Sequence, residues 1–410
     1  MSVFTPLHLN NGTTLPNRIA KAAMEENMAD ADHAPSAALI RLYQAWAQGG
    51  AGLLITGNVM VDRTAMTGAG GVVLENAQFL PRFQRWAQAA QQGGGQVWVQ
   101  LNHPGRQMPQ NLGQVTVAPS AVALNVGSLS KQFALPQALS EAQIEAIIAR
   151  FVNSAQLAEQ AGFDGVQIHA AHGYLLSQFL SPLSNVRTDA WGGSLANRAR
   201  LLLEIVRQVR AAVSADFTVA VKLNSADFQR GGFSAEDAKT VVQWLGDLQV
   251  DVVELSGGSY EAPAMQGQTR DGRTLAREAY FLEFAQDIAQ IATMPLMVTG
   301  GIRRLEIAEQ VLASGVALVG MATALALQPD LPQTWREHNH TAVPMLKPIA
   351  WRNKALASAA NMAVVRQQLK RLSRGAVPKA NASAAWALLC NQWEMRGRSQ
   401  QYRAWVNAQS

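Results

Sequence analysis

Residues 140–174 read SEAQIEAIIARFVNSAQLAEQAGFDGVQIHAAHGY and contain a helix pattern followed by a strand pattern. Ser140 stands as an N-cap with Gln143 at the reciprocal capping position, and apolar residues then follow the 3.6-residue period as far as Gly162. Gly165–His169 is short and largely apolar, as expected of a parallel strand that is buried on both faces. This stretch therefore predicts one helix–strand unit of an α/β fold.

The same alternation runs along most of the chain. Eight candidate strands share this short, apolar character: Ile19–Met24, Gly52–Val59, Gln96–Leu101, Gly165–His169, Thr218–Leu223, Val250–Leu255, Pro295–Thr299 and Ala317–Val319. Eight strand–helix units predict a (β/α)8 TIM barrel. A Rossmann dinucleotide site is not expected, because neither Gly68-Ala69-Gly70-Gly71 nor Gly93-Gly94-Gly95 forms a G-x-G-x-x-G turn between a strand and a helix.

Two segments fall outside the barrel pattern. Residues 103–139 are too long for an ordinary loop, so we expect them to carry function or structure of their own. Residues 337–410 read as a helical extension, which divides the chain into a barrel over residues 1–336 and a C-terminal part. That part is expected to pack on its own barrel or on a partner subunit, so a homodimer is one of the two outcomes.

Charge is unevenly distributed along the chain. The net charge is +5, and residues 351–410 alone contain ten Lys or Arg and one Glu, so a tail of +9 leaves −4 for the remainder. A solvated helical face or a subunit contact explains such a basic tail without nucleic acid or a membrane. We expect neither of these as a partner.

Composition limits the class of protein. With 48% hydrophobic and 15% charged residues among 410, the chain is not disordered. Its single cysteine, Cys390, excludes an internal disulfide, a four-cysteine iron–sulfur cluster and a cysteine-based zinc site. The N-terminus shows no targeting pattern, and no apolar run approaches the ~18 residues of a membrane helix. We therefore expect a cytoplasmic protein.

Polar residues follow the predicted fourth strand at its C-terminal end, where TIM barrels have their active sites. They are His169, His172 and Tyr174. The two histidines fit three interpretations: zinc ligands, hydrogen-bond donors to a carbonyl oxygen that gains negative charge, or structural residues. Tyr174 is a phenol that can deliver a proton beside such a carbonyl.

Two further features lie on other strands. Lys222 is in the middle of the apolar fifth strand, so it should face the barrel interior and needs an anionic or acceptor-rich partner. It can pair with an electron-rich cofactor ring or form a Schiff base. Gly300-Gly301 and Gly320-Met321 end the seventh and eighth strands, where barrels commonly bind phosphate.

Several stretches together resemble the Old Yellow Enzyme family of FMN-dependent ene-reductases. They are His169–Pro182, Asn185–Arg198, Pro16–Ile19, Gln100–Gln107, Asn224–Phe228 and Thr299–Ile302. The likeness covers about residues 3–335 in the order and spacing of the family. It is to the single-domain members, since the length and the single cysteine exclude the larger type with an iron–sulfur cluster.

The resemblance implies an FMN cofactor and a role for each matching residue. His169 and His172 would bind the substrate oxygen, and Tyr174 would protonate the α-carbon. The remaining implied contacts are to the flavin: Gln100 and Lys222 at its pyrimidine edge, Ala22, Ala23, Met24 and Asn58 along its ring, and Gly300, Gly301, Gly320 and Met321 at its phosphate. No metal is implied.

The sequence departs from the family pattern at several positions. Lys222 stands where the family usually has arginine, which keeps a cation near the flavin. Glu25 stands where many members have Cys or Thr, and an ionised carboxylate there should lower the flavin potential, so Glu25→Gln is expected to raise it. Met321 replaces an arginine that often clasps phosphate. The loops expected to face the substrate, 107–137 and 258–275, match no family member closely enough to name it. Within them, Tyr260 and Phe133 are candidates for lining the substrate, with ordinary packing as the alternative.

The implied activity is a ping-pong reaction. NADH or NADPH reduces FMN, and an α,β-unsaturated carbonyl compound or another small activated alkene then takes hydride from flavin N5. A related FMN barrel dehydrogenase or demethylase and a quinone or xenobiotic reductase are the alternatives closest to this one. More distant alternatives are a Schiff-base aldolase that uses Lys222 and a flavin-binding protein whose basic tail contacts another macromolecule.

Overall fold

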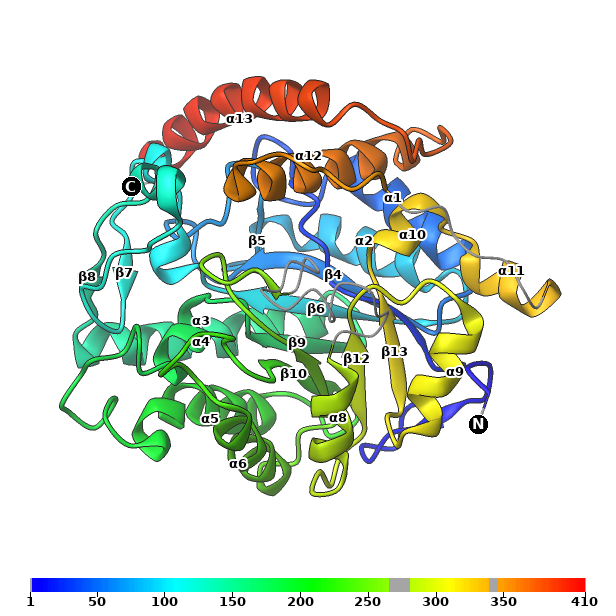
Figure 1. Cartoon of the computed structure of the whole chain (residues 1–410), viewed down its shortest axis with the longest axis horizontal. Helices are drawn as coiled ribbons and strands as arrows, with labels where there is room; N and C mark the ends of the chain where they lie inside the picture. The colour runs from blue at the N-terminus through cyan, green and yellow to red at the C-terminus, as the bar shows by residue number, and fades with distance from the viewer. Residues whose placement is uncertain (1, 265–280, 339–345, 410) are drawn as a thin grey trace.

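The computed structural model describes residues 2–264, 281–338 and 346–409, and its centre is a closed parallel barrel (Figure 1). The barrel strands are β3 (Ile19–Lys21), β4 (Leu53–Met60), β6 (Gln96–Asn102), β9 (Gly165–Ala170), β10 (Thr218–Asn224), β11 (Val252–Ser256), β12 (Leu296–Thr299) and β13 (Leu318–Met321). The barrel closes because β3 pairs with β13 on one side and with β4 on the other. The predicted TIM barrel is confirmed; the largest difference is that the first strand ends at Lys21 rather than at Met24.

Helices surround the barrel and alternate with its strands. They are α1 (Ala37–Gln48), α2 (Leu80–Gln91), α3 (Glu141–Gln160), α5 (Leu195–Ala212), α6 (Ala235–Asp247), α8 (Leu282–Ala289), α9 (Leu305–Ala313) and α10 (Thr323–Leu327), with α4 (Leu175–Leu180) and α11 (Leu331–Glu337) in addition. The capping box predicted for α3 is present between Ser140 and Gln143. Gly162 follows the end of α3 with φ +81°, a conformation that favours glycine.

The barrel interior changes from apolar to polar along the strands. One apolar cluster fills the half of the barrel nearer the N-terminal ends of the strands. It is formed by the inward-facing Leu53, Trp98, Ala220, Val252, Met297 and Leu318. An N-terminal hairpin of β1 (Leu7–His8) and β2 (Thr14–Leu15) closes that end, and Leu15 is fully buried in the same cluster. The C-terminal strand ends carry polar residues instead, so the open, reactive end of the barrel is the opposite one.

The long segment after β6 has structure of its own, as its length predicts. It contains the 3-10 helices η2 (Gly105–Gln107), η3 (Gln110–Leu112) and η4 (Gly127–Gln132), and the short paired strands β7 (Val117–Ala118) and β8 (Gln137–Ala138). This segment forms one wall of the barrel mouth.

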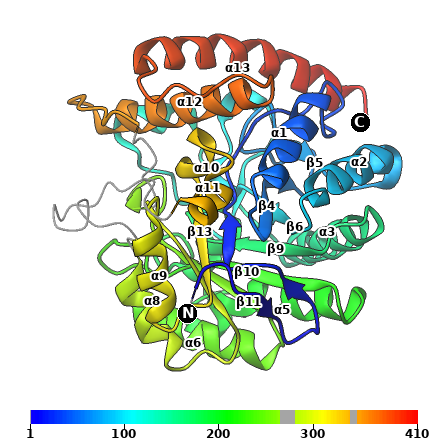
Figure 2. The same ribbon diagram turned by 90° about the vertical axis from the view of Figure 1, so that its right-hand side faces the viewer.

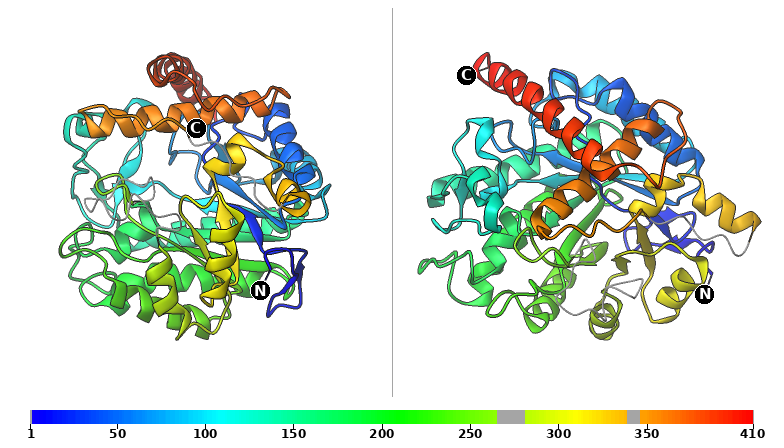
Figure 3. Two further views of the ribbon diagram at one scale, coloured as in Figure 1. Left: turned by 45° about the vertical axis from the view of Figure 1, so that its right-hand side comes forward. Right: turned by 45° about the horizontal axis from the view of Figure 1, so that its top comes forward.

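Two C-terminal helices, α12 (Lys354–Leu372) and α13 (Ala384–Asn407), lie across the barrel loops (Figures 2 and 3). From α13, Arg398 donates to Ala29 O at 3.1 Å, and the Tyr402 hydroxyl donates to Arg63 O at 2.7 Å. Thus part of the basic tail is bound to the loops that follow β3 and β4. Trp386, Leu389 and Trp393 remain exposed on the outer face of α13, so whether they form a homodimer contact stays a prediction.

No helix in the described part of the chain is both long and apolar enough to cross a membrane.

We predict that the hairpin plug stabilises the barrel. Leu15→Ala should lower the free energy of unfolding by about 2–5 kcal/mol, because it removes a fully buried side chain and leaves a cavity. Urea unfolding measures the change. Leu135→Ala is the matched control, since that leucine is 66% exposed and its loss should cost less than about 0.5 kcal/mol. Equal effects of the two substitutions would contradict the role of the plug.

Candidate active site

A buried ion pair lies at the centre of the polar half of the barrel. The parallel register of β10 and β11 places Lys222 opposite Glu254, and Lys222 Nζ lies 2.7 Å from Glu254 Oε1. Lys222 is 4% exposed and Glu254 is fully buried. This contact holds Lys222 Nζ against the carboxylate, whereas a Schiff-base lysine needs an amine that can attack a carbonyl carbon, so the pairing disfavours the aldolase interpretation.

Neutral polar side chains complete this layer. Gln167 Nε2 donates to Glu254 Oε2 at 2.7 Å, and Gln100 Nε2 donates to Gln167 Oε1 at 2.7 Å. Thr299 Oγ1 donates to Glu254 Oε1 at 3.1 Å. The carboxylate thus accepts from three side chains, which fixes the Lys222 ammonium at the floor of the mouth.

His169 is opposite Lys222 in the parallel register near the end of β9, and His172 follows this strand. Their ring centroids are 5.1 Å apart. His169 Nδ1 accepts from Ala171 N at 3.2 Å, so in the neutral ring the proton is on Nε2. His172 has φ +62°, its backbone N–H donates to Asn224 Oδ1 at 3.1 Å, and its Nε2 lies 2.7 Å from Ser256 Oγ. These contacts fix both rings in the mouth.

Burial and the Lys222 charge determine the protonation of this pair. Burial lowers the pKa of His169 and of His172 well below 6.5, and the positive charge of Lys222 lowers both further. Both rings are therefore neutral near pH 7. In this state they act as hydrogen-bond donors rather than as acids.

Tyr174 stands beside the histidines. Its ring centroid lies 5.0 Å from that of His169, and its hydroxyl lies 3.1 Å from the hydroxyl of Tyr260. Burial raises the pKa of Tyr174 well above 10.0, so the phenol keeps its proton at physiological pH. The Phe133 ring lies 6.4 Å from that of Tyr260, so the two residues suggested for substrate lining are close to each other, and Tyr260 is the one that contacts Tyr174.

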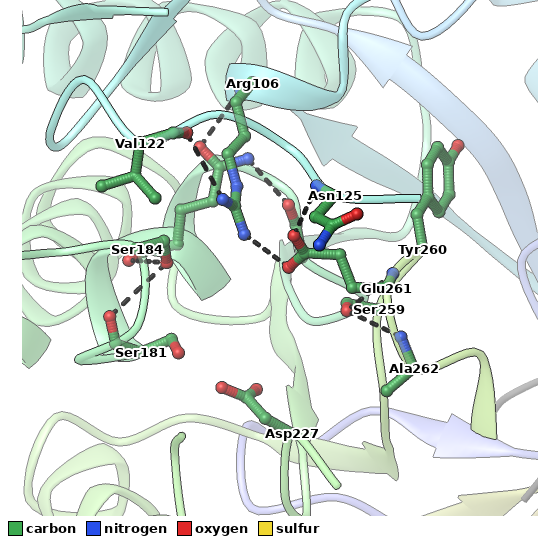
Figure 4. A network of polar contacts seen from close by, with 12 residues as sticks. Arg106, Val122, Asn125, Ser181, Ser184, Asp227, Ser259, Tyr260, Glu261 and Ala262 are labelled. Atoms are coloured by element: carbon green, nitrogen blue, oxygen red, sulfur yellow. Dashed lines mark hydrogen bonds and ion pairs between the residues drawn. The ribbon is translucent and has the colours of Figure 1, made fainter. Parts of the chain in front are cut away.

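A network of polar contacts lies next to Tyr260 in the chain and centres on Arg106 and Glu261 (Figure 4). Arg106 donates to Glu261 Oε2 at 2.7 Å and to Ala123 O at 3.0 Å, while Glu261 Oε1 accepts from Asn125 N at 2.8 Å. These contacts join the segment after β6 to the loop after β11. Of the substrate-facing loops expected at 107–137 and 258–275, residues 265–275 lie outside the described residues.

The residues that the sequence assigns to a flavin surround the same mouth. Ala22 and Met24 are buried at the end of β3, where Ala23 is half-buried, and Asn58 is opposite Gln100 in the sheet. Among the described residues, no group pairs with Asn58 Oδ1 or with either polar side-chain atom of Asn102, although all three are buried. Buried polar atoms without partners are costly, so these atoms fit a polar-edged ring such as FMN.

The glycines at the ends of β12 and β13 fit a phosphate. Gly300 and Gly301 have φ +133° and +78°, and both lie at the surface or close to it. A Cβ at Gly320 would lie 2.1 Å from Thr299 Cγ2, so this position admits only glycine without a shift. The Met321 side chain is buried in the core, which leaves its backbone as the part that can face an anion.

Sequence reasoning missed three residues of this site: Gln167, Glu254 and Arg366. Gln167 and Glu254 did carry a signal, because each is a lone polar residue inside an apolar strand at the inward-facing position. No sequence pattern pointed to Arg366, because its ion pair with Glu25 joins residues that are 341 positions apart. No group of three or more potential metal ligands occurs in the parts of the chain that the structure describes.

The barrel and this set of side chains define the class of flavin-dependent barrel oxidoreductases. The chain belongs to the NADH:flavin oxidoreductase / NADH oxidase family, whose profile matches residues 2–341. This membership confirms the predicted resemblance and the predicted cofactors, FMN with a nicotinamide dinucleotide as reductant.

Individual relatives agree with this assignment. The chain is 40% identical over 354 residues to the NADH-dependent flavin oxidoreductase iliE of Neonectria sp. (strain DH2), covering 80% of this chain but 46% of the relative. It is 36% identical to iliE of Hypocrea jecorina (strain QM6a), covering 80% and 87%. The chain thus spans less than half of the first relative. The solved Old Yellow Enzyme homologue from Zymomonas mobilis superposes with a TM-score of 0.71 at 26% identity, covering 83% and 94%.

We predict that Lys222 and Glu254 stabilise the protein only as a pair. Lys222→Met should lower the free energy of unfolding of the apoprotein by about 3–5 kcal/mol, because it leaves a buried carboxylate without a cation. The double variant Lys222→Met/Glu254→Gln should recover much of this loss. Denaturant unfolding of the flavin-free protein measures both. A double variant less stable than Lys222→Met would contradict the pairing.

We predict a pH-dependent loss of stability from the buried histidines. Burial lowers the pKa of His103 to about 4 from 6.5, and His169 and His172 shift in the same direction. Below pH 6.5 the unfolded chain binds protons that the folded chain excludes, so stability is full above this pH and falls as the pH drops toward 4. Each histidine contributes up to about 1.4 kcal/mol per pH unit.

Urea unfolding between pH 7.5 and 5.5 measures this slope. His103→Gln should reduce it by about a quarter, because burial lowers the pKa of His33 as well, whereas the exposed His8→Gln should leave it unchanged. A slope that is the same in both variants would contradict the assignment.

Proposed function

We propose that this protein is an FMN-dependent ene-reductase that reduces the C=C bond of a small α,β-unsaturated carbonyl compound or similar activated alkene with NADH or NADPH. One observation carries the proposal: two neutral histidines and a protonated tyrosine lie together, and one of the histidines is opposite the buried Lys222 in the sheet. A carbonyl oxygen needs donors while it gains charge, and the adjacent carbon needs an acid.

His169 and His172 would hold the substrate oxygen. The His169 Nε2–H is set for donation by the contact of Nδ1 with Ala171 N. When Ser256 donates to His172 Nε2, the proton of that ring is on Nδ1, which gives a second donor. Because both rings are fixed and buried, their hydrogen bonds strengthen as negative charge develops on the oxygen.

Tyr174 would protonate the α-carbon. Its raised pKa keeps the phenol protonated until a strongly basic carbon forms next to it. Tyr260 lies within hydrogen-bond distance of the Tyr174 hydroxyl and would stabilise the tyrosine after proton transfer. A bound FMN would supply the chemistry that carries hydride from the nicotinamide to the β-carbon.

The chain's own residues would hold the cofactor around this constellation. Gln100 and Lys222 would face the pyrimidine edge, and Asn58 has an unpaired amide oxygen toward the same mouth, as judged among the described residues. Backbone groups of Gly300, Gly301, Gly320 and Met321 would bind the phosphate.

Other redox activities of the same barrel differ in what they need at the substrate carbon. A quinone reductase protonates oxygen, and an amine dehydrogenase or demethylase removes hydride from its substrate. Neither needs a carbon acid beside a pair of oxygen-binding donors. The Tyr174–His169 arrangement therefore favours alkene reduction over these alternatives.

We predict that Tyr174→Phe separates the two half-reactions. Anaerobic NADH or NADPH should bleach the flavin absorbance of the wild type, and 2-cyclohexenone should restore it. In Tyr174→Phe the first step should keep its rate, while the second should slow by about 10²-fold or more because the acid is lost. Stopped-flow absorbance measures both steps.

Tyr402→Phe is the control, since it removes a tyrosine hydroxyl that bonds to Arg63 O away from the mouth. Its two half-reactions should match those of the wild type. A wild-type flavin that bleaches with the nicotinamide but does not recover with the enone would reject the proposed function.

A further inference from the structure

Glu25 brings a carboxylate to the barrel mouth that the proposed chemistry does not use. It lies four residues beyond the end of β3, and its negative charge is among the causes that raise the pKa of both Tyr174 and Tyr260. Within the described part of the chain, Glu25 Oε1 is buried and has no hydrogen-bond partner. A carboxylate in this position needs compensation, because a reduced flavin and a developing enolate are both negative.

Arg366 of α12 supplies that compensation. Its Nη2 lies 2.5 Å from Glu25 Oε2, and the side chains of Glu25 and Arg366 are only 18% and 16% exposed. When the Asn27 amide is oriented to satisfy both groups, its oxygen accepts from Arg366 Nε at 3.3 Å and from Nη2 at 2.7 Å. Arg366 Nη1 lies 3.5 Å from Asn391 Oδ1 of α13, so the guanidinium is held from three sides.

The surrounding helices leave the guanidinium little freedom. α12 packs against α1 and α10 and against the 3-10 helix η4 of the segment after β6. Lys370 of α12 forms an ion pair with Glu394 of α13, and Arg398 extends from α13 to Ala29 O. The C-terminal helices thus lie across the barrel loops (Figure 3). Arg366 is the α12 residue whose side chain contacts Glu25.

We infer that Arg366 is a positioning residue of the active site: it holds Oε2 of the Glu25 carboxylate in place and offsets the charge of this carboxylate beside a bound flavin. Arg366 acts through Glu25 and is not itself a group that contacts the reacting atoms. This role of Arg366 rests on the flavin-binding part of the proposed function and does not depend on whether the substrate is an alkene.

The test is the midpoint potential of the bound flavin at pH 8, measured by anaerobic reduction in the presence of reference dyes. Arg366→Gln should lower the potential, because the carboxylate charge is no longer offset and disfavours the anionic reduced flavin. Glu25→Gln should raise it. In the Glu25→Gln background, Arg366→Gln should produce a much smaller shift than in the wild type.

Lys370→Gln is the matched control for packing. It breaks the α12–α13 ion pair with Glu394 but leaves Glu25 and Arg366 in place. Its melting temperature should fall while its midpoint potential stays at the wild-type value. An equal shift with Lys370→Gln, an unchanged potential with Arg366→Gln, or the same Arg366→Gln shift in both backgrounds would overturn the inference. None of these results depends on reduction of 2-cyclohexenone, so failure of the proposed substrate class would be seen separately.

Discussion

The arrangement of the site depends on the ion pair between Lys222 and Glu254 inside the barrel. Two charges removed from water must be well paired, and here Gln167 and Thr299 supply the further hydrogen bonds that the carboxylate needs. The half of the barrel nearer the N-terminal strand ends is filled with apolar side chains and cannot accept charged or hydrogen-bonding side chains. The polar layer, and with it the reactive chemistry, is therefore restricted to the C-terminal strand ends.

Burial and the charge of Lys222 determine the protonation of the neighbouring histidines. Lys222 and burial together keep His169 and His172 neutral, so the histidines donate hydrogen bonds without carrying charge themselves. Burial also keeps the Tyr174 proton in place. A mouth with neutral donors, a weak acid and the Lys222 cation suits a reaction in which negative charge appears on the substrate and is then removed by protonation.

The fold could be read almost completely from sequence, because burial on both faces of a parallel strand leaves a strong local pattern. The capping box of α3 and the eight strand runs have local causes and were predicted. The site was predicted where its residues follow strand ends, as at His169. The pairing of Glu254 with Lys222 could be identified only once the register of their strands was known. Arg366 depends on how a helix far along the chain packs, and no local pattern indicates that contact.

Glu25 and Arg366 also differ in whether they lie within the region that the family profile matches. The family profile matches residues 2–341, which includes Glu25 and excludes both α12 and α13. The Glu25 carboxylate thus pairs with an arginine outside the matched region. Beside a bound flavin, such a carboxylate would be unfavourable without a compensating cation. The C-terminal helices supply a cation, so Glu25 and the extension are best understood as one feature.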